Sequence, residues 1–220
     1  MSSREIILGR IKRNLRGLAS KPLASGMKAN NSTRLDVEQL IDRFTVEINR
    51  VDGEVIRARN HDEAVRKICS NLETSKNIKL MMSGDPLWEK YHYVEGIKRG
   101  LPTSSMSICS INNIPDIASI NVSVVGAECL IAETGTVVLV ASPGQPRTLS
   151  LLPETVIVVA EPSQLLLDME SVLRQLMSRK IFSEASNVTF VTGPSRTADI
   201  EKTLVKGVHG PKRLVVVLVS

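Results

Sequence analysis

The feature that most constrains the fold is a regular alternation between short apolar segments rich in β-branched residues and longer segments with helical periodicity. Strands are expected at residues 54–58, 78–83, 155–160, 187–191 and 213–219. Helices are expected at 36–51, 61–73, 163–177 and 197–205, with 85–102 helical or irregular. Asp36 precedes the first helix and suits its N-cap. Such alternation predicts an α/β domain with a largely parallel sheet flanked by helices.

The middle of the sequence departs from this alternation. Two apolar runs over residues 129–141 surround Thr134 and Gly135. This arrangement predicts a central β-hairpin whose glycine adopts a positive φ. If the flanking strands alternate, Glu133 shares a face with Ile131, and a carboxylate on an apolar face could be a base or nucleophile with a raised pKa. The alternative is an edge glutamate that faces water.

The N-terminal segment differs from the rest of the chain in charge. Residues 1–34 carry eight Lys/Arg and one acid, so that residues 35–220 have a net charge of −2 within a total of +5. The first part predicts a basic amphipathic helix, followed by a polar linker, and residues 35–220 form the main domain. The helix packs on the domain or a second subunit, or it serves a membrane surface or as a transit peptide.

Composition excludes several classes of function. The main domain is not basic and aromatic residues make up 3%, so no nucleic-acid partner is expected. No apolar run reaches the roughly 18 to 20 residues of a membrane span, which favours a cytoplasmic protein. Three separated cysteines and no paired-histidine motif predict no metal, no iron–sulfur cluster and no cofactor. A homo-oligomer stays open.

Residues 192–201, TGPSRTADIE, join an apolar strand to an expected helix. A helix start at the carboxyl end of a strand favours anions, and Arg196 adds a bidentate fork for carboxylate or phosphate. In the alternative, Ser195 or Thr197 only caps the helix. Arg147 could clamp an anion or be solvated, and His209, within GVHGP, could transfer protons or only fit a tight turn.

Four ordered motifs, IAETGTVVL, RTLSLLP, TGPSRTADIE and GVHGP, resemble the lactate-utilization protein C type of the LUD-domain family. The resemblance implies a NagB/RpiA/CoA-transferase-like fold. It also implies a bacterial protein that works with two iron–sulfur partners in oxidising L-lactate to pyruvate. Glu128 stands where the resemblance leads us to expect aspartate, which leaves the role of that acid open.

We therefore expect a non-redox subunit of a lactate-oxidising system, which binds a small anionic ligand in one cleft. The expected catalytic residues are Glu133 and His209. The expected ligand-binding residues are Thr134, Gly135, Arg147, Ser150, Gly193, Ser195, Arg196 and Thr197. Two alternatives are an acyl- or CoA-transferase with Glu133 as nucleophile and an assembly protein that docks through its N-terminal helix.

Overall fold

The computed structural model describes residues 4–5, 7–10, 36–73, 77–101, 105–108, 119–197, 205–207 and 210–220. The chain divides into two units, Met1–Arg34 and Leu35–Ser220. In the first unit the described residues are helical, and Ile7 and Leu8 are 56% and 46% exposed. The expected linker lies outside the described residues.

The second unit is built around a parallel sheet in the order β1-β12-β7-β4-β2-β3. Its strands are β1 (Glu54–Ala58), β2 (Lys79–Met82), β3 (Ser105–Ile108), β4 (Val122–Gly126), β7 (Thr155–Ala160) and β12 (Arg213–Val219). Consecutive residues of a strand point to opposite faces. In β12, for example, Leu214 and Val216 enter one hydrophobic core, whereas Val215 and Val217 enter the other.

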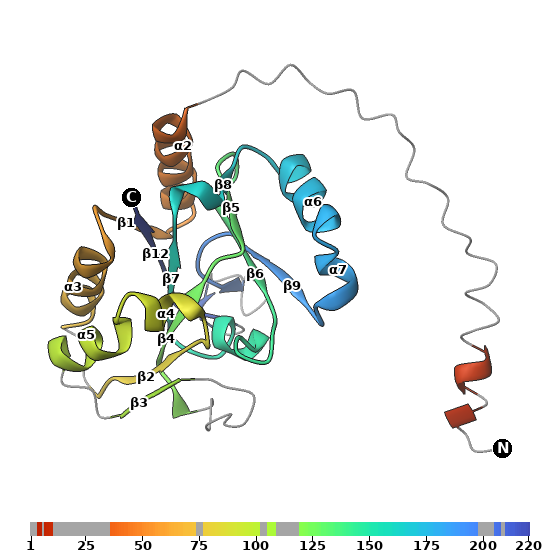
Figure 1. The fold of residues 1–220 in the computed structure, drawn as a ribbon, viewed down its shortest axis with the longest axis horizontal. Coiled ribbons are helices and arrows are strands. Elements are labelled where there is room, and N and C mark those ends of the chain that lie inside the picture. Colours follow the sequence, from red (N-terminus) through yellow and green to blue (C-terminus); the bar gives the residue numbers. More distant parts are fainter. Residues whose placement is uncertain are drawn as a thin grey trace. The chain divides into compact units, whose positions relative to one another are not determined.

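Helices cover one face of this sheet. They are α3 (His61–Leu72), α4 (Pro86–Lys90) and α5 (Tyr93–Gly100), which lie together on one side in Figure 1. The buried side chains of Ile68, Leu72, Trp88, Tyr93 and Ile97 pack there against the sheet. Between α4 and α5, His92 has a left-handed backbone conformation, with φ of 51°, which breaks the expected segment at 85–102 into two helices.

A second sheet and helix α2 (Val37–Arg50) cover the other face. This sheet has the order β8-β5-β6-β9, with β8 (Leu165–Leu166), β5 (Cys129–Ile131), β6 (Thr136–Val140) and β9 (Val188–Val191). Its inner face shares a core with Phe44 and Ile48 of α2. Helices α6 (Met169–Ser178) and α7 (Ile181–Glu184) pack on its outer face (Figure 1).

The α/β fold with a largely parallel sheet, flanking helices and a central β-hairpin is thus confirmed. The hairpin is β5–β6, and Gly135 in its turn has φ of +62°. Helix α2 begins as expected, because the Asp36 side chain accepts a hydrogen bond of 2.8 Å from the backbone of Gln39. No helix in the described ranges is long and apolar enough to cross a membrane.

The expected helix at 163–177 is partly wrong. Residues Pro162–Gln164 form a 3-10 turn, Leu165–Leu166 form β8 beside β5, and α6 begins only at Met169. Asp168 caps α6 by accepting a bond of 2.8 Å from the backbone of Ser171. The leucines suit a helix equally well, but their pairing with β5 supplies backbone partners and buries them in the second sheet.

The expected helix at 197–205 is wrong at both ends. Arg196–Thr197 form strand β10, which pairs antiparallel with β11 (Val205–Lys206). Residues 198–204, between them, lie outside the described residues. Ser195 therefore does not precede a helix: its backbone N–H donates to the carbonyl of Pro211, and its carbonyl accepts from Gly207.

Candidate functional site

The chain leaves two neighbouring strands of the main sheet toward opposite faces. After β2 it enters α4 and α5 on one face, and after β4 it enters the β5–β6 hairpin on the other. Ligands of open α/β sheets bind outside the carboxyl ends of strands at such a switch point. A ligand site is therefore expected at the carboxyl ends of β2 and β4.

A crevice of about 230 Å³ lies at this point. Its walls come from the residues after β2, from the end of β4 and from the loop after β6. They include Gly84, Asp85, Gly126, Glu128, Ser142 and Gln145. A second hollow, of about 480 Å³, shares Gly84 and Asp85 with the crevice and continues over Trp88 and His92.

The crevice is built on close contacts that involve three glycines. A Cβ atom on Gly126 would lie 2.1 Å from Oδ2 of Asp85. The other carboxylate oxygen of Asp85 accepts a bond of 2.9 Å from the backbone of Leu87 and so caps α4. The backbone N–H of Gly84 donates to the carbonyl of Gly144 at 2.6 Å. These contacts hold the Asp85 carboxylate at the carboxyl edge of the sheet.

Gln145 fastens the loop after β6 to the end of β4. Its amide nitrogen donates to the carbonyl of Gly126 at 3.0 Å, and its amide oxygen accepts from the backbone N–H of Gly126 at 3.2 Å. One side chain thus satisfies both backbone groups of Gly126, as a neighbouring strand would. The loop wall of the crevice is therefore fixed to the sheet.

The charge in the crevice comes from two acids. Glu128 is ion-paired with Arg179 of the α6 end, and the side chain of Glu128 is 17% exposed. Burial, followed by the Glu128 carboxylate, raises the pKa of the neighbouring Cys129 thiol to about 12, so this cysteine is not a nucleophile near neutral pH. With Asp85 and Glu128 in its walls, the crevice suits a hydroxyl or amide group better than an anion alone.

The predictions from sequence missed this crevice. A sequence pattern that indicates a site was present, because the expected strand that ends at Ser83 is followed at once by a glycine, an acid and a proline. The same pattern, a strand that ends in glycine, also occurs at residues 192–196, where the sequence predicted the anion site. What could not be seen locally is that Gly126 and Gln145 meet Asp85.

Glu133 lies in the turn of the β5–β6 hairpin. Its side chain is 50% exposed, and a carboxylate oxygen lies 3.8 Å from a guanidinium nitrogen of Arg43 in α2. Ile131 is fully buried, so the two side chains do not share an environment as the alternation suggested. The turn intervenes, and the carboxylate faces water and a cation rather than an apolar face.

The hairpin turn and the loop after β9 lie side by side at the end of α2. The Thr136 hydroxyl lies 2.6 Å from that of Thr134 and 2.7 Å from that of Thr192. A Cβ atom on Gly135 would lie 2.3 Å from the backbone nitrogen of Ile48, and one on Gly193 would lie 2.5 Å from the carbonyl of Val51. Both glycines are thus required for packing against α2.

Arg196 belongs to this same group of residues. Its guanidinium lies 2.8 Å from the carboxylate of Asp52, in the turn after α2. Glu133, Thr134, Gly135, Gly193 and Arg196 therefore lie along α2 and the turn that follows it. Ser195 instead bonds through its backbone to Pro211 and Gly207. Thr197 continues into β10. His209 lies outside the described residues, so its place in a cleft stays a prediction.

Arg147 and Ser150 lie at the opposite end of β6. Both belong to the 3-10 turn Arg147–Ser150, where the Ser150 hydroxyl donates to the carbonyl of Arg147 at 2.9 Å. The two residues line a narrow pocket with Leu139 and Thr189, which are partners near the far end of the β6–β9 ladder. A strand of this length spans about 13 Å, so the structure does not unite Arg147 with Glu133 and Arg196 in one cleft.

Arg147 also lines a wider hollow of about 540 Å³, together with Ser142, Glu184, Ser186 and Asn187. Within the part of the chain that the structure describes, no ion pair neutralises its guanidinium, in contrast to Arg43, Arg179 and Arg196. Among the described side chains, no group of three or more His, Cys, Asp or Glu residues is arranged to hold a metal ion.

Fold and site together define an α/β protein with a ligand-sized crevice at the switch point of a parallel sheet. A family model described as the LUD domain matches residues 41–219. The chain belongs to the LUD domain family.

Relatives and a solved structure agree with this assignment. The chain is 30% identical to Lactate utilization protein C of Bacillus pumilus, over 84% of this chain and 80% of the relative. It is 33% identical to Lactate utilization protein C of Bacillus subtilis, over 62% of this chain and 60% of the relative. A crystal structure of a DUF162 family protein from Deinococcus radiodurans shares the fold, with a TM-score of 0.61, 18% identity, and coverage of 84% of this chain and 99% of that one.

Proposed function

We propose that this LUD-domain protein takes part in lactate utilization. In this role it is a subunit without a redox centre of its own, which works with two iron–sulfur proteins in the oxidation of L-lactate to pyruvate and binds a small anion. The observation that carries the proposal is the similarity to relatives named Lactate utilization protein C, which in one case extends over 84% of the chain. The iron–sulfur partners and the anion come from the resemblance and from the site residues.

Arg147 is the arginine best placed to hold the anion. It is exposed and lines two hollows. The wider hollow is also lined by the polar residues Ser142, Ser186 and Asn187 and by one acid, Glu184. A guanidinium binds a carboxylate through two parallel hydrogen bonds, and the neighbouring polar groups can complete the shell. Arg196 is a weaker candidate, because Asp52 already occupies its guanidinium.

The loop that carries Arg147 also forms a wall of the crevice. Ser142 lines both the crevice and the wider hollow, and Gln145 joins this loop to Gly126. An anion at Arg147 therefore contacts the same loop that borders the Asp85 carboxylate. We do not extend the proposal to acyl transfer, since Glu133 is half exposed and lies beside Arg43.

Deletion of the gene in its own organism tests the role. We expect growth with L-lactate as the sole carbon source to be lost and growth with pyruvate to be kept, and we expect the Bacillus subtilis relative to restore growth on L-lactate. Unimpaired growth of the deletion strain on L-lactate would overturn the proposal. A pull-down of tagged protein from lactate-grown cells under anaerobic conditions tests the partners, of which we expect two iron–sulfur proteins.

A further inference from the structure

A partly buried histidine lies at the start of α3, away from every predicted site residue that the structure describes. The side chain of His61 is 14% exposed. Its ring stacks on that of Tyr91, with centroids 3.4 Å apart and planes inclined by 15°. Its Nδ1 atom lies 2.9 Å from the hydroxyl of Tyr93, and its Nε2 atom lies 3.7 Å from the carboxylate of Glu161.

From this histidine a series of contacts leads to the crevice. Tyr93 is fully buried and packs edge-on against Trp88, with centroids 5.0 Å apart. The indole N–H of Trp88 donates to the hydroxyl of Ser83 at 3.1 Å. Ser83 directly precedes Gly84 and Asp85, which line the crevice. The position of this wall therefore depends on how Tyr93 and Trp88 are packed.

The hydrogen bond between His61 and Tyr93 depends on protonation. Burial raises the pKa of Tyr93 well above its ordinary range, so its hydroxyl stays protonated and can donate a hydrogen bond. A neutral His61 can accept that hydrogen bond at Nδ1 while its Nε2–H faces Glu161. An imidazolium donates from both nitrogens, so protonation reverses this hydrogen bond: Nδ1–H donates to the Tyr93 oxygen, and the buried proton of the Tyr93 hydroxyl loses its acceptor.

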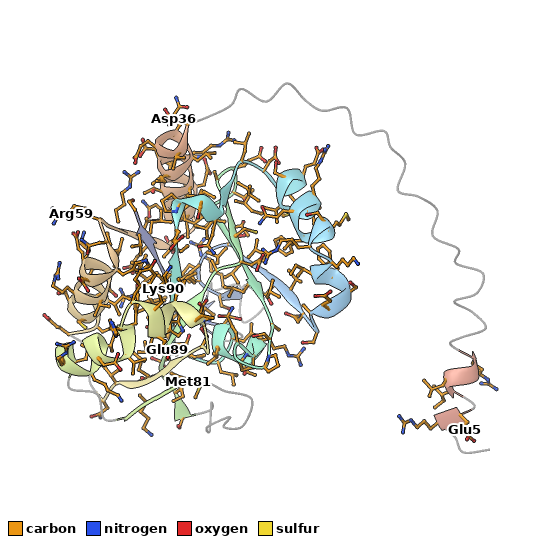
Figure 2. The ribbon with its side chains drawn as sticks, in the orientation of Figure 1. Glu5, Asp36, Arg59, Met81, Glu89 and Lys90 are labelled. Atoms are coloured by element: carbon orange, nitrogen blue, oxygen red, sulfur yellow. The ribbon has the colours of Figure 1, made fainter. Side chains whose placement is uncertain are left out.

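The groups that face His61 come from three elements. Burial is the main cause that lowers the pKa of His61, the Glu161 carboxylate opposes it, the Lys90 ammonium at the end of α4 lowers it, and Asp62 of α3 raises it. Figure 2 labels Lys90, whose ammonium lies 4.7 Å from the centre of the Tyr91 ring. Because the pKa in the folded protein is lowered, His61 takes up its proton only below the ordinary value of about 6.5.

We propose that His61 is a positioning residue for the crevice: in its neutral form it holds Tyr93, Trp88 and the turn Ser83–Asp85 in place, and on protonation it reverses its hydrogen bond with Tyr93, leaves the buried Tyr93 proton without an acceptor and so loosens that wall. The proton comes from solvent and binds at Nδ1. The proton of the Tyr93 hydroxyl then turns away from the imidazolium, which donates to the Tyr93 oxygen through Nδ1 and stays directed at Glu161 through Nε2.

The loosening of the crevice wall can be measured through Trp88. Trp88 is its single tryptophan, so a ¹⁵N-labelled sample gives one indole N–H signal in an NMR spectrum. In a titration from pH 7.5 downward, we expect that signal and the backbone amide signals of Gly84 and Gly126 to shift with one shared midpoint. The midpoint should equal that of the His61 ring protons and lie below about 6.5.

Four variants separate this mechanism from general acid effects. His61→Gln should abolish the shared transition, and His92→Gln, a change at an exposed histidine of the same segment, should leave it in place. Tyr93→Phe removes the donor that favours neutral His61 and should raise the midpoint, whereas Glu161→Gln removes a carboxylate that favours the imidazolium and should lower it. Tyr93→Phe and Glu161→Gln keep His61, so they test whether the transition follows its protonation even if His61→Gln does not fold.

Three results would overturn the proposal. They are an indole signal that does not follow the His61 titration, a transition that persists in folded His61→Gln, and midpoints of Tyr93→Phe and Glu161→Gln that move in the same direction. The measurement needs no ligand, so its failure would leave the proposed role in lactate utilization untouched.

Discussion

The guanidinium of Arg196 forms an ion pair with Asp52 at 2.8 Å, so the arginine singled out from the sequence as an anion ligand already has a carboxylate partner. Both side chains are substantially exposed, at 35% and 48%. Arg196 therefore connects the loop after β9 to the turn after α2.

Replacing Arg196 should have a small effect on stability and none on anion binding. Exposed ion pairs contribute roughly 0.2 to 1 kcal/mol, so we expect Arg196→Ala to lower the free energy of unfolding by about 0.5 kcal/mol. Chemical denaturation measures this. We expect lactate or phosphate to raise the melting temperatures of the variant and the wild type equally; a response of the wild type alone would return the ligand role to Arg196.

Replacing Arg147 should weaken anion binding and leave stability nearly unchanged. The side chain is exposed and forms no ion pair with the carboxylates that the structure describes, so Arg147→Ala should change the free energy of unfolding by less than about 0.5 kcal/mol. Anion binding, followed by calorimetry, should weaken by roughly 2 kcal/mol or more, because a charged partner is removed. Arg66→Ala, a change at an exposed arginine of α3, is the matched control and should bind as the wild type does.

The contact between Gly126 and Asp85 predicts a coupled pair of substitutions. In Gly126→Ala the new methyl group would lie 2.1 Å from Oδ2 of Asp85, and overpacking of this kind costs about 1 to 3 kcal/mol. In an Asp85→Ala background the same change should cost far less, because the carboxylate is gone. A double-mutant cycle by denaturation measures the coupling. Equal costs of Gly126→Ala in the two backgrounds would show that the carboxylate is not what excludes a side chain.

The cap of α6 predicts a dependence on pH. Hydrogen bonds from the backbone and side chain of Ser171 lower the pKa of Asp168 below its ordinary value. A carboxyl with a lowered pKa in the folded state adds stability above its unfolded pKa of about 3.9 and loses that stability as the pH falls through its folded pKa. Asp168→Ala should therefore cost roughly 0.5 to 2 kcal/mol at pH 7.

That cost should shrink when the pH falls below about 4. Thermal denaturation of both proteins across this range is the test. Asp168→Asn keeps a capping oxygen that does not titrate, so it should retain most of the stability at pH 7 and show the weaker pH dependence. A cost of Asp168→Ala that stays constant with pH would contradict the assignment.

Much of the fold could be predicted because its signals are local. The cap at Asp36, the uninterrupted apolar strands β7 and β12, and the glycine of the hairpin turn each follow from residues close together in the sequence. The failures arose where a distant partner decides the structure. Leu165–Leu166 become a strand because β5 lies beside them, and Thr197 is a strand residue because Val205 pairs with it.

The candidate site was harder to predict for the same reason. Asp85, Gly126 and Gln145 come from three separate segments, and only the order of strands β2 and β4 brings them together. Residue types at strand ends indicate that a site is possible. They do not say which ends are neighbours, so Arg147 and Arg196 were assigned to one cleft although β6 separates them.

The place of β12 has a consequence for how the chain folds. Among the strands that the structure describes, β1 pairs only with β12, and Glu54 lies opposite Val215, far along the sequence. Closing a loop of this length is entropically unfavourable and makes folding slow. Until β12 is in place, both β1 and β7 present an open edge to the surroundings, and such edges pair readily with other chains. We therefore expect aggregation during synthesis or refolding to begin at this gap, and chaperones that shield exposed strands to raise the yield of folded protein.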